Sequence, residues 1–312
     1  MVWLVKSRIQ LFVLIAICLV PVTANAGEPI LGIGPAGEIQ QLHTGFAFTE
    51  GPATDGKGNL FFSDIPNARI HKIDATGELS VFTDESRHSN GLMFNAAGEL
   101  VACEMDGQLA AWNVDSKERR VLIDKSDGKR FNAPNDLVID RQGGIYFTDP
   151  HYRAPDPWPQ GKTCVYYLSA EGKVTRLIDS LVAPNGITLS PDESTLYVFP
   201  SGDSTMRAYA VQSPGQIDEG RDYFTIKSAD GKTAGGCDGV TIDTQGNLYL
   251  TTKLGVVVVS PAGVQLGIIE LPEHPANVTF AGPEGKTLYA TARKSLYVVP
   301  MHSQGHRFAT GE

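Results

Sequence analysis

Cysteine is scarce in this sequence. Four cysteines occur among 312 residues, and Cys18 lies in an apolar N-terminal stretch. The other three, Cys103, Cys164 and Cys237, are widely spaced, contain no Cys-x-x-Cys pair and are odd in number. These features exclude a disulfide framework and a zinc site built on closely spaced thiolates. We expect small, buried apolar side chains at the three positions, with the pairing of two of them left open.

Basic residues are also in short supply, and they form no cluster. The chain has 26 Lys and Arg against 35 Asp and Glu, which gives a net charge of −9. Binding to a phosphate backbone needs patches of Lys and Arg, so nucleic acid is excluded as the main partner. The hydrophobic share of 42% and the charged share of 20% are those of a folded globular chain.

Long apolar runs are absent beyond the N-terminus. Residues 9–20 are mostly apolar, Lys6 and Arg8 precede them, and Ala24-Asn25-Ala26 follows as a small-x-small cleavage site. This order predicts a signal peptide over residues 1–26 and a periplasmic or secreted protein. An uncleaved N-terminal anchor is the alternative. Cleavage would leave 286 residues with a net charge of −11, and no membrane contact is expected for that mature chain.

What the sequence does contain is one short pattern repeated six times. A polar residue begins an apolar stretch, a turn position follows eight residues after that start, and a second apolar stretch comes next. This order predicts a strand, a tight turn and a second strand in each repeat. The first stretches are 50–55 (EGPATD), 90–95 (NGLMFN), 135–140 (NDLVID), 185–190 (NGITLS), 238–243 (DGVTID) and 277–282 (NVTFAG). The turn positions are Gly58, Gly98, Gly143, Glu193, Gly246 and Gly285.

The repeat length indicates the architecture. Successive starts lie 40, 45, 50, 53 and 39 residues apart, which suits four antiparallel strands per repeat. We therefore predict an all-β, six-bladed β-propeller that occupies residues 27–312 as one domain. A β-sandwich is the alternative, but sandwiches do not repeat one hairpin six times. The last repeat lacks a fourth strand, so residues 39–46 are expected to supply it and close the ring. The polar tail, residues 302–312, is expected to contribute little.

The residue that starts each repeat is a carboxylate or a carboxamide. In a propeller these six side chains lie on one ring at a mouth of the central channel. They offer hard oxygen ligands and neither sulfur nor imidazole, which favours Ca²⁺ or Mg²⁺. Calcium is the expected ion, with Mg²⁺, Mn²⁺ and Zn²⁺ as alternatives. The six positions are Glu50, Asn90, Asn135, Asn185, Asp238 and Asn277.

Several stretches resemble the senescence-marker-protein/gluconolactonase/luciferin-regenerating-enzyme-like family of six-bladed propellers. They are 48–52 (FTEGP), 133–140 (APNDLVID), 144–150 (GIYFTDP), 183–192 (APNGITLSPD) and 236–240 (GCDGV). The resemblance covers about residues 40–300. It implies a single catalytic divalent metal held by four side chains, and hydrolysis of a sugar lactone as in gluconolactonases. The implied ligands are Glu50, Asn135, Asn185 and Asp238. Asn90 and Asn277 fall outside that set.

This ligand set suits metal-assisted ester hydrolysis, with Asp238 as the general base for water. No Gly-x-Ser-x-Gly motif indicates a covalent nucleophile. Expected substrate contacts at the same mouth are Asn90, Glu104, His151, Tyr152 and Arg153, the last three on a proline-rich loop. His88 either contacts substrate as well or is an ordinary loop histidine.

Other functions remain open on the sequence. A non-catalytic propeller that binds a ligand or partner has the same fold, and a phosphotriesterase would use the same metal site. The expected partner is a small-molecule lactone, and the oligomeric state is a monomer or a dimer.

Overall fold

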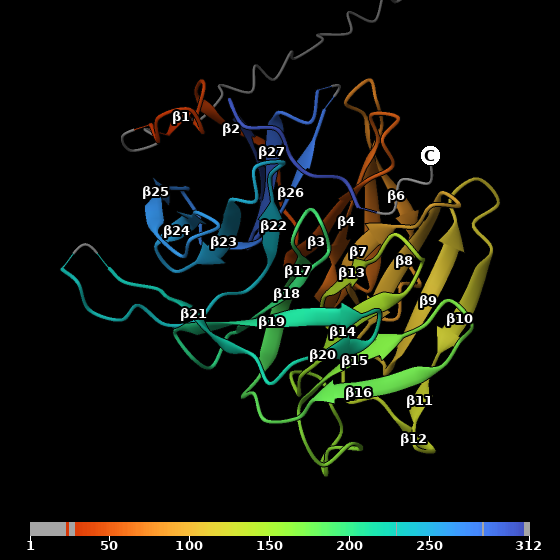
Figure 1. Ribbon diagram of the computed structural model, residues 1–312. Helices are drawn as coiled ribbons and strands as arrows, with labels where there is room; N and C mark the ends of the chain where they lie inside the picture. Colours follow the sequence, from red (N-terminus) through yellow and green to blue (C-terminus); the bar gives the residue numbers. More distant parts are fainter. Residues whose placement is uncertain (1–22, 25–28, 229, 283, 309–312) are drawn as a thin grey trace, which may run out of the picture.

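A computed structural model describes residues 23–24, 29–228, 230–282 and 284–308. Small antiparallel sheets are arranged around a central axis, and the first strands of the blades gather at the centre (Figure 1). The described residues contain one short 3₁₀ helix, η1 (Ile65–Asn67), and otherwise strands and turns. The six-bladed β-propeller predicted from the repeats is confirmed.

Each blade has four strands in meander order from the axis outward. Blade 1 comprises β3 (Thr49–Thr54), β4 (Leu60–Asp64), β5 (Arg69–Ile73) and β6 (Leu79–Thr83). Blade 2 comprises β7 (Ser89–Phe94), β8 (Glu99–Glu104), β9 (Gln108–Asn113) and β10 (Arg119–Ile123). Blade 3 comprises β13 (Leu137–Ile139), β14 (Ile145–Asp149), β15 (Cys164–Leu168) and β16 (Val174–Ile178). Blade 4 comprises β17 (Pro184–Leu189), β18 (Thr195–Pro200), β19 (Thr205–Ser213) and β21 (Arg221–Thr225). Blade 5 comprises β22 (Val240–Ile242), β23 (Leu248–Thr252), β24 (Gly255–Val259) and β25 (Gln265–Ile269). Blade 6 comprises β26 (Pro275–Ala281), β27 (Thr287–Ala292), β28 (Ser295–Pro300) and the N-terminal β2 (Ile39–Thr44).

Four further short strands lie outside this pattern. β1 (Thr23–Ala24) pairs with β2, and β20 (Gln216–Ile217) pairs with the end of the long β19. β11 (Lys125–Ser126) and β12 (Lys129–Arg130) form a small hairpin between blades 2 and 3.

The predicted hairpin turns have the backbone conformation that the sequence requires. All six turn positions have positive φ, from 61° to 96°, and Glu193 adopts this left-handed conformation without being glycine. In five blades a side-chain oxygen three residues before the turn position accepts backbone N–H groups of the turn; in blade 3, for example, Asp140 binds Gln142 and Gly144. Each turn therefore satisfies much of its own hydrogen bonding.

The first strands close into a ring because glycine lets them approach. β3, β7, β13, β17, β22 and β26 each contact the first strands on either side. A Cβ on Gly51 would lie 2.0 Å from the Asn90 carbonyl oxygen, and one on Gly186 would lie 2.5 Å from the Asp238 carbonyl oxygen. Gly91 and Gly239 occupy the same position in blades 2 and 5 and are equally confined. A side chain there would push neighbouring blades apart.

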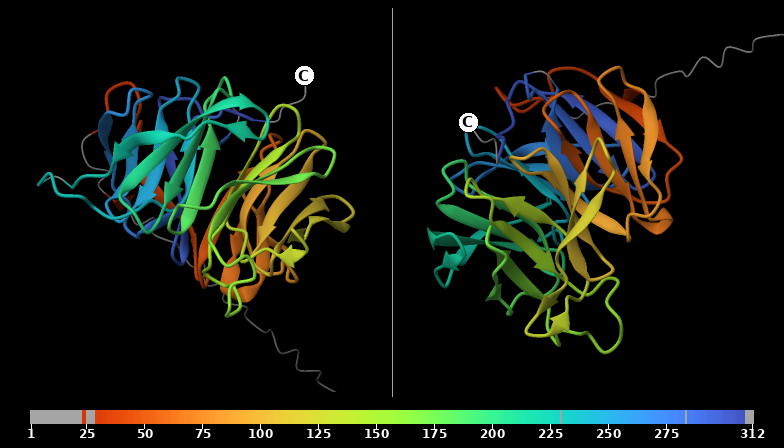
Figure 2. Two further views of the ribbon diagram at one scale, coloured as in Figure 1. Left: turned by 60° about the horizontal axis from the view of Figure 1, so that its bottom comes forward. Right: turned by 90° about the vertical axis from the view of Figure 1, so that its right-hand side faces the viewer.

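The two ends of the chain meet in blade 6, as predicted. β2 pairs antiparallel with β28, and the N-terminal red strand lies in the blue last blade (Figures 1 and 2). Ile39 is fully buried in the blade core, and Phe46 packs edge-on against Phe62 of blade 1 with ring centroids 5.1 Å apart. Leu42 is 37% exposed, and the register of β2 against β28 shifts at this point, between Gln41 and His43.

The C-terminal tail corrects the expectation that it contributes little. The His302 and Ser303 amides donate to the Ile33 carbonyl, and the His306 amide donates to the Ile242 carbonyl at 2.9 Å. Phe308 packs against the cores of blades 4 and 5. The tail is polar by composition, but its described part is held by backbone hydrogen bonds that a composition does not reveal.

The three downstream cysteines are buried and free, which leaves no disulfide among the described residues. The predicted signal peptide lies outside those residues, except for Thr23 and Ala24 in β1. No described helix is long and apolar enough to span a membrane.

Candidate active site

The six ring residues lie at one end of the central channel, which we call the ring mouth. Each lies within two residues of the start of a first strand, and five of the six are at least 94% buried, with Asp238 half-buried. Hydroxyl groups on second strands link the blades beneath them. Ser63 donates to the Asn90 carbonyl and Thr148 to the Asn185 carbonyl, both at 2.8 Å, and Thr251 donates to the Ala276 carbonyl at 2.7 Å. Alternate blades are thus tied to the next one at the level of the ring.

Carboxylates converge at the centre of this ring. Burial raises the pKa of Glu50 well above its ordinary value, and the charges of Asp238 and Asp136 raise it further. Burial also raises the pKa of Asp238 to about 6, against the opposing effects of a hydrogen bond from Asn185 and the charge of Arg293. Glu50 and Asp238, from blades 1 and 5, are therefore close enough to repel each other.

Asp136 is a third buried carboxylate that the sequence reasoning did not single out. It accepts from the Leu137 amide at 3.0 Å and from Asn277 Nδ2 at 3.4 Å, and burial raises its pKa to about 7. A signal was present in the repeat, because Asp136 stands where four other blades have the confined glycine. In blade 3 the aspartate at that position lines a cavity together with Asn277.

These groups fit a divalent cation. No described Lys or Arg forms an ion pair with Glu50, Asp136 or Asp238, so their charges are left without a cationic partner in the protein. The Asn135 side chain forms no hydrogen bond with a described residue, which leaves its amide oxygen free. Within the described ranges no three His, Cys, Asp or Glu side chains are arranged as a metal site by themselves. The amides of Asn135 and Asn185 would have to complete the set, which is the chemistry that Ca²⁺ accepts.

The chain that leads into the ring is braced by an acidic residue at the end of a second strand. Asp64 accepts from the Ala47 and Phe48 amides, and Asp149 accepts from the Asn132 and Ala133 amides at 2.9 and 2.8 Å. Both acids lie fourteen residues after their ring residue, so blades 1 and 3 use the same device.

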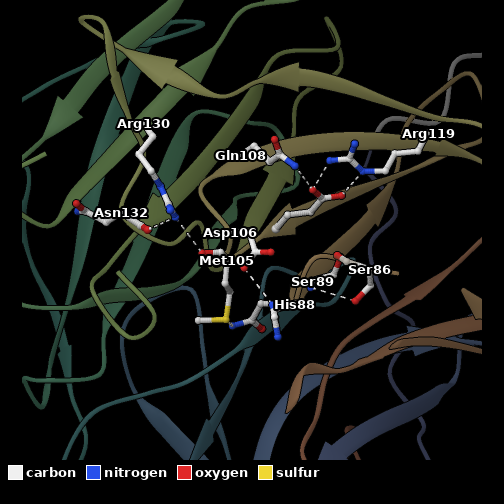
Figure 3. Close-up of polar contacts among 11 residues, drawn as sticks. Ser86, His88, Ser89, Met105, Asp106, Gln108, Arg119, Arg130 and Asn132 are labelled. Atoms are coloured by element: carbon white, nitrogen blue, oxygen red, sulfur yellow. Dashed lines mark hydrogen bonds and ion pairs between the residues drawn. The ribbon is translucent and has the colours of Figure 1, made fainter. Parts of the chain in front are cut away.

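Glu104 occupies the same position in blade 2 and corrects one expectation. Its carboxylate is fully buried, accepts from Arg119 Nε at 2.8 Å and also pairs with Arg119 Nη2 and Gln108 Nε2. Both oxygens are thus engaged by the outer strands of the blade, as Figure 3 shows for the labelled Arg119 and Gln108. We do not retain Glu104 as a substrate contact.

The proline-rich loop after β14 contacts the ring through Tyr152. Tyr152 Oη hydrogen-bonds to Ser201 Oγ and accepts from Asn185 Nδ2 at 3.5 Å. Tyr152 is 45% exposed; partial burial raises its pKa, and the charges of Asp238 and Glu50 raise it further against the hydrogen bonds with Ser201 and Asn185. His151 stacks on Trp158, and its buried Nδ1 has no partner among the described residues. Arg153 is exposed, and no contact with the ring is seen for it.

A buried glutamine holds this loop in place. Gln160 Nε2 donates to the carbonyls of Lys129 and Arg130 at 3.0 and 2.9 Å, and its Oε1 accepts from Arg176 at 2.8 Å. The hairpin β11–β12 and the loop therefore form one braced wall on the blade 3 side of the mouth.

On the blade 2 side, His88 Nδ1 lies 3.0 Å from Asp106 Oδ1 (Figure 3). Arg87 and His88 both have positive φ, near 55°, and directly precede Ser89 at the start of β7. Asn90 is buried with its Nδ2 3.9 Å from Met105 Sδ, so its polar end has only a weak protein acceptor. His88 and Asn90 are therefore both placed at the ring mouth.

On the blade 6 side, the exposed Arg293 lies in the turn after β27, and its carbonyl accepts from the amide of Thr49, which precedes Glu50. The φ of Arg293 is 50°, its Nη2 lies 2.8 Å from His274 Nδ1, and its guanidinium lies 5.5 Å from the centroid of the Phe48 ring. Its charge lowers the pKa of Asp238. The sequence reasoning missed this residue, because a lone arginine in a turn carries no pattern.

Known proteins resemble the whole propeller. The profile of the SMP-30/Gluconolactonase/LRE-like region matches residues 48–294. A gluconolactonase of Zymomonas mobilis is 32% identical over 285 residues, which cover 83% of this chain and 80% of that protein. The structure of a Xanthomonas campestris gluconolactonase superposes with a TM-score of 0.78 at 29% identity, over 85% of this chain and 89% of that one.

A more distant structure shows the same fold alone. It is described as a calcium-binding protein, regucalcin, from Agrobacterium tumefaciens, and has a TM-score of 0.74 at 19% identity over 86% of this chain and 95% of that one. The repeat of six blades, the oxygen-rich ring and the profile match over most of the chain lead to one conclusion. The chain belongs to the SMP-30/gluconolactonase/LRE-like family.

Proposed function

We propose that this protein hydrolyses a sugar lactone, as its named gluconolactonase relatives do. The observation that carries the proposal is the pair of carboxylates formed by the buried Glu50 and the half-buried Asp238, beside the amides of Asn135 and Asn185 at the ring mouth. Because named relatives in this family are gluconolactonases, we interpret this arrangement as a site for lactone hydrolysis. The sequence has no Gly-x-Ser-x-Gly motif that would indicate a covalent serine nucleophile.

Glu50, Asn135, Asn185 and Asp238 would hold one divalent cation, with Ca²⁺ expected from the oxygen ligands. When bound, the cation supplies a Lewis acid that polarises the lactone carbonyl. The protein itself orients the substrate between the Tyr152 wall and the Asn90 side of the mouth. His151 and Arg153, on the same loop as Tyr152, are proposed contacts for the hydroxyl groups of the sugar.

Asp238 is the proposed general base. Its carboxylate accepts a proton from the water whose oxygen adds to the carbonyl carbon. The ring C–O bond then breaks, and the proton passes to the departing alkoxide oxygen. The product is a hydroxy acid, and no covalent enzyme intermediate is needed.

Export is a second part of the proposal, supported by the sequence of residues 1–26. It places a monomer or dimer in the periplasm or outside the cell, where a small lactone would be the partner. N-terminal sequencing of the protein from culture fractions tests this, with Gly27 as the expected first residue.

The test of the activity is a panel of lactones, with a phosphotriester as a comparison substrate. Chelator-treated protein should be inactive, and Ca²⁺, Mg²⁺, Mn²⁺ and Zn²⁺ are added back in turn. Lactone turnover restored by one of these ions supports the proposal. Phosphotriester turnover with no lactone turnover would identify the other hydrolase, and metal binding without any turnover would identify a binding propeller.

The variant Glu50→Gln sharpens the panel, because it keeps an oxygen ligand and removes one negative charge. Metal affinity measured by calorimetry should fall with it, whereas Lys57→Gln at the other end of the channel should leave that affinity unchanged. Equal affinity in both variants would contradict the assignment of Glu50.

A further inference from the structure

The turn after β27 presents a guanidinium whose hydrogen-bonding capacity is mostly unused. Arginine has five N–H donors in a planar fork. Arg293 uses one of them on His274 Nδ1, and no ion pair or other side-chain hydrogen bond joins it to a described residue. Because arginine only donates, Nδ1 of His274 must be the unprotonated acceptor. Burial lowers the pKa of His274, and the charges of Arg293 and Lys253 lower it further, which keeps the ring neutral.

The guanidinium is held in a fixed position by contacts that leave its charge uncompensated. Phe48 lies against it at 5.5 Å, and His274 fixes one nitrogen. The backbone is fixed as well, since the Arg293 carbonyl accepts from the Thr49 amide at 2.8 Å. A side chain that is oriented in this way loses little freedom when it binds a partner.

The surrounding side chains do not supply an anion. Glu273 is the acid close to this turn, and it is engaged by the Lys294 amide, Ser295 Oγ and Tyr297 Oη. Lys294 and Lys253 are exposed and form no ion pair with a described residue. In an acidic chain, the blade 5 and blade 6 side of the ring mouth is therefore locally cationic.

Two arginines on the blade 2 and blade 3 side, Arg119 and Arg130, differ from Arg293 in that their side chains donate to acceptors within the protein. Arg119 is committed to Glu104, and Arg130 donates to the carbonyls of Phe131 and Asn132. Their donors are used within the protein, whereas the exposed Arg293 uses one donor on His274 and no other on a described side chain. A free, oriented fork at the rim of a candidate active site suits a carboxylate or phosphate group.

We propose that Arg293 binds an anionic group on the substrate, so that the preferred lactone carries a carboxylate or a phosphate in addition to the lactone ring. This inference rests on the proposed lactonase function and names its substrate class. The negative floor of the mouth, Glu50 and Asp238, keeps such a group at the rim beside Arg293. The lactone carbonyl then faces the ring.

The experiment compares three substrates: D-glucono-1,5-lactone, which is neutral, D-glucaro-1,4-lactone, which carries a carboxylate, and 6-phospho-D-glucono-1,5-lactone. Wild-type protein should show a higher kcat/KM for one of the anionic lactones, and which one identifies the source of the anion. Arg293→Gln should lower the ratio of anionic to neutral kcat/KM by roughly 10- to 100-fold, mainly through KM, because a charge-assisted hydrogen bond is lost. Lys294→Gln removes the same charge one residue away and should lower the ratio less than twofold, because the exposed Lys294 adds only a screened charge and no oriented fork.

Arg293→Lys separates charge from geometry, since lysine keeps the charge but lacks the fork. A partial fall in the ratio is expected. Thermal unfolding of each variant shows whether the fold is intact. An unchanged ratio in Arg293→Gln, or an equal loss on all three lactones, would overturn the inference while leaving the lactonase function in place.

If no lactone is turned over, a binding measurement can still test whether Arg293 recognises an anionic group. Calorimetric titration of gluconate, glucarate and 6-phosphogluconate into the metal-loaded protein measures the same preference without catalysis. Tighter binding of an acid with a second anionic group, lost in Arg293→Gln and kept in Lys294→Gln, supports the inference even then. Equal binding of all three would contradict it.

Discussion

The two ends of the central channel are built by different means. At the ring mouth the buried groups are side chains: the polar ring itself, the bridging hydroxyls of Ser63, Thr148 and Thr251, and the bracing acids. At the other end, which we call the tail mouth, hairpin turns satisfy their own hydrogen bonds. The two termini meet there through backbone contacts such as that of the His302 amide with the Ile33 carbonyl.

A cavity of about 520 Å³ opens toward the tail mouth and reaches the underside of the ring at Asp136 and Asn277. Its lining includes the turns of blades 1 and 2 and the tail residues Arg307 and Phe308. The contacts that join the ends of the chain and the polar ring therefore lie at different mouths. Backbone pairing holds the chain ends at the tail mouth, and the ring mouth holds carboxylates whose burial is costly.

Removing the N-terminal strand should have the largest effect on this arrangement. Deleting residues 29–46 takes β2 out of blade 6 and withdraws the buried Ile39 and Phe46. Each such side chain contributes roughly 1.5–3 kcal/mol, against a total stability of about 5–15 kcal/mol. Aggregated protein or a much lower unfolding midpoint is expected in thermal denaturation. A monomeric deletion variant with wild-type stability would show that β2 does not close the ring.

Asp238→Asn and Asp136→Asn test whether chemistry belongs to the ring mouth alone. Loss of the proposed base at Asp238 should lower kcat by about 10²–10⁴-fold with the fold retained. Asp136→Asn should cost much less activity and should leave the unfolding midpoint unchanged or raised, because it removes a charge that opposes Glu50. Steady-state kinetics on gluconolactone measures both. Equal losses in the two variants would place Asp136 in the catalytic step.

The brace at Asp149 should make stability depend on pH. Burial raises the pKa of Asp149 in the folded protein to about 7, from an ordinary 3.8. The folded state therefore binds a proton more tightly than the unfolded state, and the free energy of unfolding falls as pH rises from about 4 to 7. The full difference corresponds to about 4 kcal/mol at most. Chemical denaturation across this range should show a flatter pH dependence in Asp149→Asn than in wild type.

The matched control for that series is Asp179→Asn, an exposed acid of the same blade that pairs with Lys162. Its pH dependence should follow that of wild type. If Asp149→Asn and wild type lose stability in parallel as pH rises, another group is responsible.

Truncation of the tail should produce the smallest effect, confined to stability. Removing residues 302–312 withdraws Phe308 and the backbone contacts to Ile33 and Ile242. Phe308 is partly buried, so its removal should cost less than the roughly 1.5–3 kcal/mol of a fully buried phenylalanine, and this loss is seen as a lower denaturation midpoint. Activity on lactones should stay close to wild type because no ring residue is touched. An unchanged midpoint would restore the view that the tail is dispensable.

Much of the fold could be predicted from the sequence, because each repeat encodes its hairpin in residues that are close together in the chain. A fixed offset of eight residues between a polar start and a turn position determines a hairpin through short-range backbone chemistry. Glu193 follows the same offset as the five glycines and adopts the same left-handed conformation. The incomplete sixth repeat left one strand missing, and β2 supplies it. The ring residues followed from the same register, since every repeat places its first residue at the same height.

The repeat pattern does not predict which side chains or backbone groups a polar side chain contacts in the folded protein. Glu104 and Asp149 stand at equivalent positions, yet Arg119 engages one and backbone amides engage the other. Arg293 reaches the mouth only because its turn packs over Phe48 from another blade. The hairpins and the register of the polar residues could be predicted from the order of residues, since both are set by short-range backbone chemistry. The charges that meet across the channel could not, because electrostatic interactions depend on distances in space that the order of residues does not specify.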